Sequence, residues 1–91
     1  MVFEDMYRYY FAPQALKEIK KIPQDVQKRI IKKLDFYCQK DPLNFADFLV
    51  DSRLGNFRFR IGDYRIVFDK ISVDSTLILK VGHRREIYRR R

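Results

Sequence analysis

The sequence has few of the residues on which several common kinds of site depend. Its 91 residues include one cysteine, Cys38, and one histidine, His83. A single cysteine excludes an internal disulfide framework, and the two residues together are too few for a zinc cluster. The three glycines are scattered at positions 55, 62 and 82, so the chain lacks a glycine-rich phosphate loop. We interpret Cys38 as a small buried residue of a helix.

Long apolar runs are also missing. No stretch reaches the ~18 apolar residues that a membrane span needs. The first residues carry Glu4 and Asp5 and lack the apolar core of a signal peptide. We therefore expect a protein of the reducing cytoplasm that does not contact membranes. At this length, we expect a single domain over residues 1–91.

The charge that is present is unevenly distributed. The chain has 20 Lys and Arg against 12 Asp and Glu, a net charge of +8. Residues 1–52 carry nine cationic and eight acidic side chains, a net charge of +1, whereas residues 53–91 carry eleven and four, a net charge of +7. Arginine binds phosphate and carboxylate oxygens bidentately, so an anionic polymer or an acidic protein is the implied partner, with a merely solubilising surface as the alternative. Nine of the eleven cations are arginines: Arg53, Arg58, Arg60, Arg65, Arg84, Arg85, Arg89, Arg90 and Arg91.

Spacing of the apolar residues predicts a strand and two helices in the first half. The aromatic-rich segment 7–11 is typical of a strand. Pro13 can begin a helix, Pro23 ends it and opens a second one, and Asp41–Pro42 stops the second. We expect the helices to form an antiparallel hairpin, followed over 43–54 by a loop with at most a short strand. The apolar stripes are Ala12, Leu16, Ile19 and Ile22 in the first helix, and Val26, Ile30, Leu34 and Tyr37 in the second.

After Gly55 the periodicity changes to that of strands. Residues 56–61 alternate apolar and cationic side chains, and Gly62–Asp63 is typical of a two-residue type II′ turn into a returning strand over 64–68. We expect a looser connection over 69–75, and then a nearly continuous apolar strand over 76–81 that is central in the sheet. The predicted fold is α+β: an N-terminal strand, a two-helix hairpin and a three-stranded antiparallel meander in one sheet, with the helices covering one face.

The predicted turn determines which side chains share a face. It pairs Ile61 with Tyr64, Arg60 with Arg65, Phe59 with Ile66 and Arg58 with Val67. Cross-strand partners point the same way, so Arg58, Arg60 and Arg65 share the face away from the helices. If the next strand keeps the same parity, Lys80, Gly82 and Arg84 join them, and Gly82 would let a ligand backbone approach closely. Adjacent guanidinium groups repel one another, which favours an anion site over an ordinary solvated face.

The chemistry open to such a face is reaction at phosphate without a metal. Arginines neutralise the charge of a pentavalent phosphorus, and the 2′-hydroxyl of RNA can serve as nucleophile. Arginine is a poor proton donor or acceptor, which leaves His83 and Tyr88 as candidates. His83 has the alternative of facing the core, and Tyr88 that of packing a C-terminal turn or of stacking on a base.

Two segments, FRFRIGDYRIVF (Phe57–Phe68) and VGHRREIY (Val81–Tyr88), resemble the RelE/ParE toxin superfamily in its RelE branch of messenger-RNA endonucleases. The resemblance covers nearly the whole chain. It implies the RelE-like fold, no cofactor, cleavage of the message in the ribosomal A site, and silencing by a cognate antitoxin, with a monomer when the toxin is free. Carried onto this sequence, it implies that Arg65 lies near the scissile phosphate, that Arg84 stabilises the transition state and that Tyr88 orients or stacks the message. We expect the remaining RNA contacts from Arg58, Arg60, Lys80, His83 and Arg85, the first two as substrate clamps where other members carry lysines.

Two other functions use the same scaffold. One is a ParE-like inhibitor of DNA gyrase without nuclease activity, and the other is a degenerate toxin or plain nucleic-acid-binding module. A gyrase inhibitor has no need of Arg65, Arg84 and Tyr88 together, so this set favours the nuclease.

Overall fold

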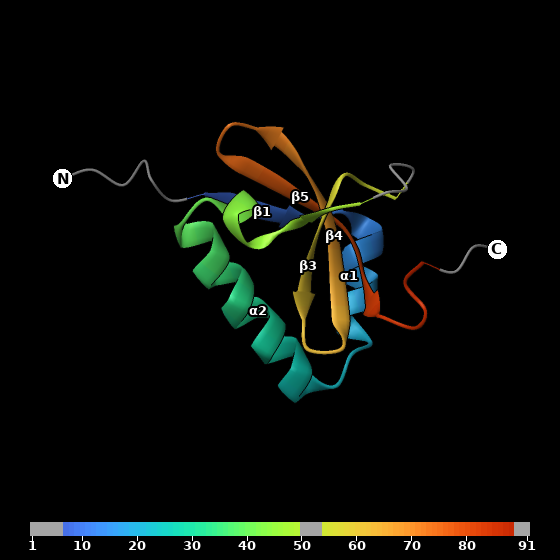
Figure 1. Ribbon diagram of the computed structural model, residues 1–91. Helices are drawn as coiled ribbons and strands as arrows, with labels where there is room; N and C mark the ends of the chain where they lie inside the picture. Colours follow the sequence, from blue (N-terminus) through green and yellow to red (C-terminus); the bar gives the residue numbers. More distant parts are fainter. Residues whose placement is uncertain (1–6, 50–53, 89–91) are drawn as a thin grey trace.

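The computed structural model describes residues 7–49 and 54–88, and within them one five-stranded sheet is flanked by two helices (Figure 1). The strand order is β1-β5-β4-β3-β2. The elements are β1 (Arg8–Phe11), α1 (Pro13–Lys20), α2 (Gln24–Gln39), the 3-10 helix η1 (Pro42–Phe45), β2 (Asp47–Phe48), β3 (Phe57–Ile61), β4 (Tyr64–Ser72) and β5 (Ser75–His83).

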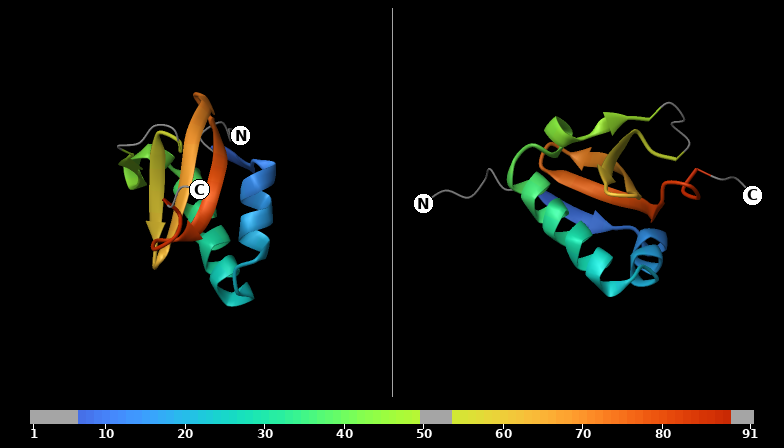
Figure 2. Two further views of the ribbon diagram at one scale, coloured as in Figure 1. Left: turned by 90° about the vertical axis from the view of Figure 1, so that its right-hand side faces the viewer. Right: turned by 60° about the horizontal axis from the view of Figure 1, so that its bottom comes forward.

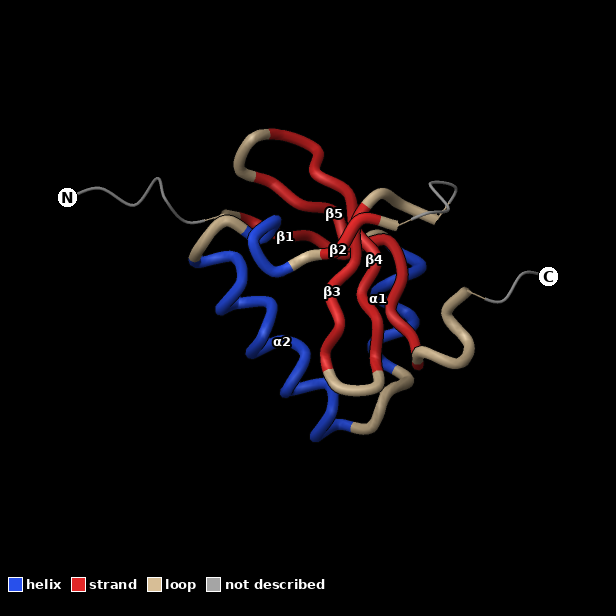
Figure 3. The backbone as a smooth tube through the Cα atoms, viewed as in Figure 1, coloured by secondary structure: helices blue, strands red, loops and turns tan. Residues whose placement is uncertain are grey.

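The sheet, whose strands are red in Figure 3, is mixed. β1 pairs in parallel with the first half of β5, from Ser75 to Ile78, and the other neighbouring strands are antiparallel. β5 thus has neighbours on both sides, as its apolar sequence predicts. The predicted α+β class with a C-terminal meander is confirmed. The short β2, at the edge beside β3, is the only regular strand in the segment predicted as a loop, within the described residues.

Both helices lie on one side of the sheet (Figure 2, right). The predicted inward residues of the meander form the core, and Cys38 is buried as expected. In α1 the predicted stripe is displaced: Ala15 is fully buried, whereas Leu16 is 42% exposed. The reason is that Ala12 is not yet helical; its N–H donates to the Ile78 carbonyl at 2.8 Å and continues the pairing of β1 with β5. Besides Ala15, the core contains Ile19, Ile22, Ile30, Leu34, Phe59, Ile61, Ile66, Phe68, Ile78 and Val81, with Phe57 and Tyr64 packed against it.

The loose connection expected over 69–75 is wrong. β4 continues to Ser72 and β5 starts at Ser75, so the two strands form a long hairpin. Side-chain hydrogen bonds close it, because Asp74 accepts from the hydroxyl groups of Ser72 at 3.0 Å and Ser75 at 3.3 Å. Register shifts between Val67 and Phe68 and beyond Lys70 interrupt the alternation of this hairpin, which explains why its sequence does not have the pattern of a strand.

The second half of β5 extends past β1 and has a free edge that α1 covers. The Val81 N–H donates to Glu18 Oε1 at 2.7 Å, and Glu18 Oε2 lies 3.5 Å from Lys80 Nζ. The Glu18 carboxylate therefore accepts the hydrogen bond of a backbone N–H at the sheet edge, which a further strand would otherwise accept. No helix in the described part of the chain is long and apolar enough to cross a bilayer.

Candidate nucleic-acid interface

The face of the sheet away from the helices carries the arginines of the β3–β4 hairpin. The observed pairs, Arg60 with Arg65 and Arg58 with Val67, confirm the predicted register. Gly62 has φ +59° and no other turn residue has a positive φ, which agrees with glycine in the first position of the turn. We call Arg58, Arg60 and Arg65 the arginine face. On β5, Lys80 pairs with Val67, and Gly82 pairs with Arg65.

Arg65 has an environment dominated by positive charge. Burial, and then the charges of Arg58, Arg60 and Arg84, lower its pKa below the usual range. Its Nη1 donates to the Gly62 and Tyr64 carbonyls, both at 3.0 Å, which holds the side chain beside the turn. Over residues 7–49 and 54–88, no carboxylate lies within 4.0 Å of this guanidinium. An anion that enters here meets cationic charge that the described protein groups do not neutralise.

Tyr88 joins the arginine face from the end of the chain. Its hydroxyl accepts a hydrogen bond of 2.8 Å from Arg58 Nη1, and the ring centroid lies 5.9 Å from Arg58 Cζ. This bond is the main reason that the pKa of Arg58 is raised, against the opposing effect of burial. Among the described residues, the buried Nε of Arg58 has no hydrogen-bond partner. The fold thus joins two site residues that are 30 positions apart.

Arg84 lies at the turn end of the same hairpin. Its backbone N–H donates to the Asp63 carbonyl at 2.7 Å, and its Nε lies 3.7 Å from Asp63 Oδ1. The side chain is half exposed, so this ion pair is weak and can exchange for a ligand. Arg85 follows, exposed, with its N–H donating to His83 Nδ1 at 3.1 Å. Arg53, Arg89, Arg90 and Arg91 lie outside the described residues.

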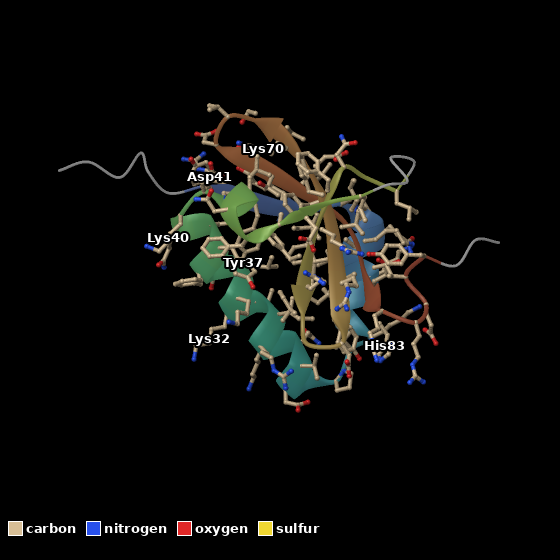
Figure 4. All side chains as sticks on the ribbon, viewed as in Figure 1. Lys32, Tyr37, Lys40, Asp41, Lys70 and His83 are labelled. Carbon is tan, nitrogen blue, oxygen red and sulfur yellow. The ribbon has the colours of Figure 1, made fainter. Side chains whose placement is uncertain are left out.

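Two of the expected RNA contacts are not brought to the arginine face. His83, labelled in Figure 4, pairs with Tyr64 across the sheet. The two rings meet edge to face with centroids 5.5 Å apart. His83 therefore belongs to the helix side, at the end of β5. Lys80 has the right parity, but its Nζ turns over the edge of the sheet toward Glu18.

A residue that the sequence analysis missed completes the site. Asp47, on the edge strand β2, lies with its Oδ2 2.9 Å from Arg60 Nε and 3.6 Å from Arg58 Nε. The two-residue strand is too short to produce an alternating pattern, so its sequence does not indicate which face Asp47 joins. Within the described residues, Asp47 is the one carboxylate paired with the arginine face.

Gly82 is in contact with the C-terminal turn. A Cβ built on it would lie 3.4 Å from both Cβ and Cδ1 of Ile87, so the chain's own C-terminal turn covers this position. The expectation that a ligand backbone approaches Gly82 stays a prediction. Val67 on the same face is fully buried, in part beneath Gly55. On this face, Ile87 and Gly55 therefore contact the positions on β5 and β4 beside the hairpin arginines.

The chemical capacity of the site follows from these groups. Several guanidinium groups with free donors can bind phosphate oxygens and stabilise negative charge that develops on them. In the part of the chain that the structure describes, no group of three or more His, Cys, Asp or Glu is placed to hold a metal ion. The arrangement suits phosphate binding and phosphoryl transfer by electrostatic stabilisation.

Solved structures with a similar fold are toxin–antitoxin complexes. The toxin–antitoxin complex RelBE2 from Mycobacterium tuberculosis matches with a TM-score of 0.71 and 23% identity, covering 86% of this chain and 98% of that chain. The archaeal RelE–RelB complex from Pyrococcus horikoshii OT3 matches with a TM-score of 0.68 and 23% identity, over 89% and 98% of the two chains. The RelB–RelE complex from Methanococcus jannaschii matches with a TM-score of 0.62 and 29% identity, over 86% and 93%.

The sequence itself identifies the family. No curated protein matches it closely enough to count as a relative. The family model described as ParE toxin of type II toxin–antitoxin system, parDE, matches residues 9–88, which span both helices, all of the sheet except Arg8, and Tyr88. The chain therefore belongs to the ParE toxin family, within the RelE/ParE toxin superfamily, and is a toxin of a type II toxin–antitoxin system.

Proposed function

We propose that this toxin is a ribosome-dependent endoribonuclease that cleaves messenger RNA in the A site and thereby stops translation. The observation that carries the proposal is that Arg58, Arg60 and Arg65 share one face of the β3–β4 hairpin, with Tyr88 bonded to Arg58 and Arg84 beside the turn. Burial, and then the positive charges of Arg58, Arg60 and Arg84, lower the pKa of Arg65. Guanidinium groups that face each other across the hairpin repel, so their clustering costs stability that a bound phosphate would recover. Such a cost is expected at a site that binds anions and not on a surface that only confers solubility.

In the proposed reaction the RNA supplies its own nucleophile. The 2′-hydroxyl attacks the adjacent phosphorus, and the negative charge that grows on the phosphate oxygens is stabilised by Arg65 and Arg84. Tyr88 orients the message or stacks on a base, while Arg58 and Arg60 hold the neighbouring backbone. Arg85, which is exposed, would contact RNA further from the scissile bond.

We also propose that a cognate antitoxin silences the toxin. Two of the three similar structures are complexes of RelE with RelB, and the third is the toxin–antitoxin complex RelBE2. An acidic or amphipathic segment of such a partner complements a chain with a net charge of +8. The free toxin would be a monomer acting in the cytoplasm, where ribosomes are found.

The alternative function is inhibition of DNA gyrase, and the ParE description of the matching family model favours it. A gyrase inhibitor works by binding a protein, so it needs no group that stabilises a reacting phosphate. The two functions therefore differ in which macromolecular synthesis stops first and in whether messages are cut.

Induction in bacteria, with pulse-labelling of DNA, RNA and protein synthesis, separates them. We expect protein synthesis to stop within minutes and messages to be cut within coding regions, while DNA synthesis continues. Arg84→Gln should relieve growth arrest, whereas Lys32→Gln, a matched loss of one positive charge on the exposed side of α2 (Figure 4), should not. Arrested DNA synthesis with intact messages would support the gyrase inhibitor, and a folded but harmless parent chain would indicate a degenerate toxin.

A further inference from the structure

A carboxylate lies within the arginine face. Asp47 reaches it from β2, with its Oδ2 2.9 Å from Arg60 Nε and 3.6 Å from Arg58 Nε. Its side chain is 40% exposed, so a ligand bound by these arginines can touch it. An acidic group weakens the binding of an anionic polymer, and its presence here therefore calls for a function other than binding.

The proposed cleavage lacks a group that accepts the proton of the 2′-hydroxyl. Arginine stays protonated and cannot do so. His83 lies on the helix side of the sheet beside Tyr64, and the Tyr88 hydroxyl already accepts a hydrogen bond from Arg58. In the described part of the chain, the other carboxylate paired with a site arginine is Asp63, which lies at the turn 3.7 Å from Arg84. Asp47 is the acceptor in contact with the arginines that would hold the substrate backbone.

We propose that Asp47 is the general base of this toxin, an inference that rests on the proposed nuclease function. The 2′-hydroxyl is attached next to the carbon that carries the scissile phosphate, which Arg65 would hold. Arg60, the closest partner of Asp47, pairs directly with Arg65 across the hairpin, so Asp47 lies beside the arginine pair at which this hydroxyl would react. Phosphate oxygens replace the carboxylate at Arg60 and leave Asp47 free to accept a proton.

The step then balances without a cofactor. Asp47 takes the proton of the 2′-hydroxyl, and the 2′-oxygen forms a bond to phosphorus. The bond from phosphorus to the 5′-oxygen breaks, this oxygen takes a proton from water, and Asp47 returns its proton to solvent. The products are a 2′,3′-cyclic phosphate and a 5′-hydroxyl end.

A base in an anion site has opposite effects on rate and on binding. Replacing Asp47 with Asn removes the proton acceptor and should lower the rate of cleavage by ~10²-fold or more. The same change removes one negative charge beside Arg58 and Arg60, so binding of RNA should become tighter or stay the same. A residue that only positions the arginines would instead lower both, because its loss disorders the groups that hold the phosphate.

The experiment uses the purified toxin with ribosomes carrying a defined message, measured in single turnover. Asp47→Asn and Asp47→Ala are compared with Asp63→Asn, the matched loss of the other carboxylate paired with a site arginine. Binding is measured on a message with a 2′-deoxynucleotide at the cleavage site, which cannot react. Sodium formate is added to Asp47→Ala, since a small carboxylate can occupy the space left and accept the proton. Circular dichroism and thermal unfolding check that each variant is folded.

We expect slow cleavage with undiminished binding for both Asp47 variants, partial recovery of Asp47→Ala in proportion to formate, and a rate within about threefold of the parent for Asp63→Asn. If folded Asp47 variants cleave at the parental rate, or if formate has no effect on a slow Asp47→Ala, Asp47 is not the base. If the parent itself cuts no message on the ribosome, the proposed function fails and this inference fails with it. The two failures are distinguishable, because the parent is inactive only when the proposed function is wrong.

Discussion

Replacing Arg65 with Gln should separate the activity of the toxin from its stability. The change removes the repulsion between Arg65 and Arg60, which face each other across the hairpin, and this gains about 0.2–1 kcal/mol. It weakens the two bonds of 3.0 Å to the Gly62 and Tyr64 carbonyls, worth about 0.5–1.5 kcal/mol each and partly kept by the glutamine amide. These effects oppose each other, so the free energy of unfolding should change by less than ~1.5 kcal/mol, or by less than ~10 °C in Tm.

The effect on cleavage should be far larger. Loss of one preorganised donor to a developing oxyanion costs ~10²–10³ in rate. Thermal unfolding by circular dichroism gives the stability, and single-turnover cleavage of a message on ribosomes gives the rate, with Lys32→Gln as a control for the loss of one positive charge. A folded Arg65→Gln variant that cleaves within a few-fold of the parent would refute the assignment of Arg65 to the reacting phosphate. A loss of Tm well beyond 10 °C would instead show that Arg65 is mainly structural.

Three further predictions concern the fold that supports this site. Gly55→Ala should destabilise by about 2–5 kcal/mol in chemical denaturation, because φ is +150° and the new Cβ would lie 2.6 Å from Val67 Cγ1; a wild-type midpoint would contradict this packing. Glu18→Ala should cost about 1–3 kcal/mol by leaving the Val81 N–H without its acceptor, and Glu18→Gln clearly less, since an amide oxygen still accepts; equal losses would show that charge, not the hydrogen bond, matters. Burial raises the pKa of Cys38 to about 11, so the folded state favours the neutral thiol. The stability that this provides is present below pH ~9 and should decline as the pH rises toward 11. When Tm is followed from pH 8 to 11, it should therefore fall less in Cys38→Ala than in the parent.

Sequence patterns predicted the structure correctly where a helix or strand has the same surroundings along its whole length. The alternation of Phe57, Phe59 and Ile61 with two arginines, and the glycine before Asp63, predict the β3–β4 register correctly because a two-residue turn leaves no freedom in the pairing. These patterns predicted the structure wrongly where the surroundings of a helix or strand change along its length. Leu16 has helical spacing, yet α1 lies over a sheet edge that buries Ala15 instead, and the bulges of the β4–β5 hairpin conceal a strand pair.

The candidate site shows the same division. Its arginines could be found from the sequence because charge on one face of a strand is a local property. Tyr88 could be found because the segment VGHRREIY resembles the toxin superfamily. Asp47 could not, since a two-residue strand has no period and its pairing with β3 is decided by how the chain returns after α2. The position of Gly82 under Ile87 likewise depends on where the C-terminal turn packs.

With one cysteine, one histidine and no glycine-rich loop, the sequence by itself limited which ligands and nucleophiles exist anywhere in the fold, and the arginines of its second half predicted a site for anions. Tertiary structure decided which of those charges act together. It turned Lys80 toward Glu18, put His83 on the helix side, and placed Asp47 among Arg58 and Arg60. The physical reason is that electrostatic and proton-transfer interactions act over a few ångströms, and only the folded chain brings residues distant in sequence to within such distances.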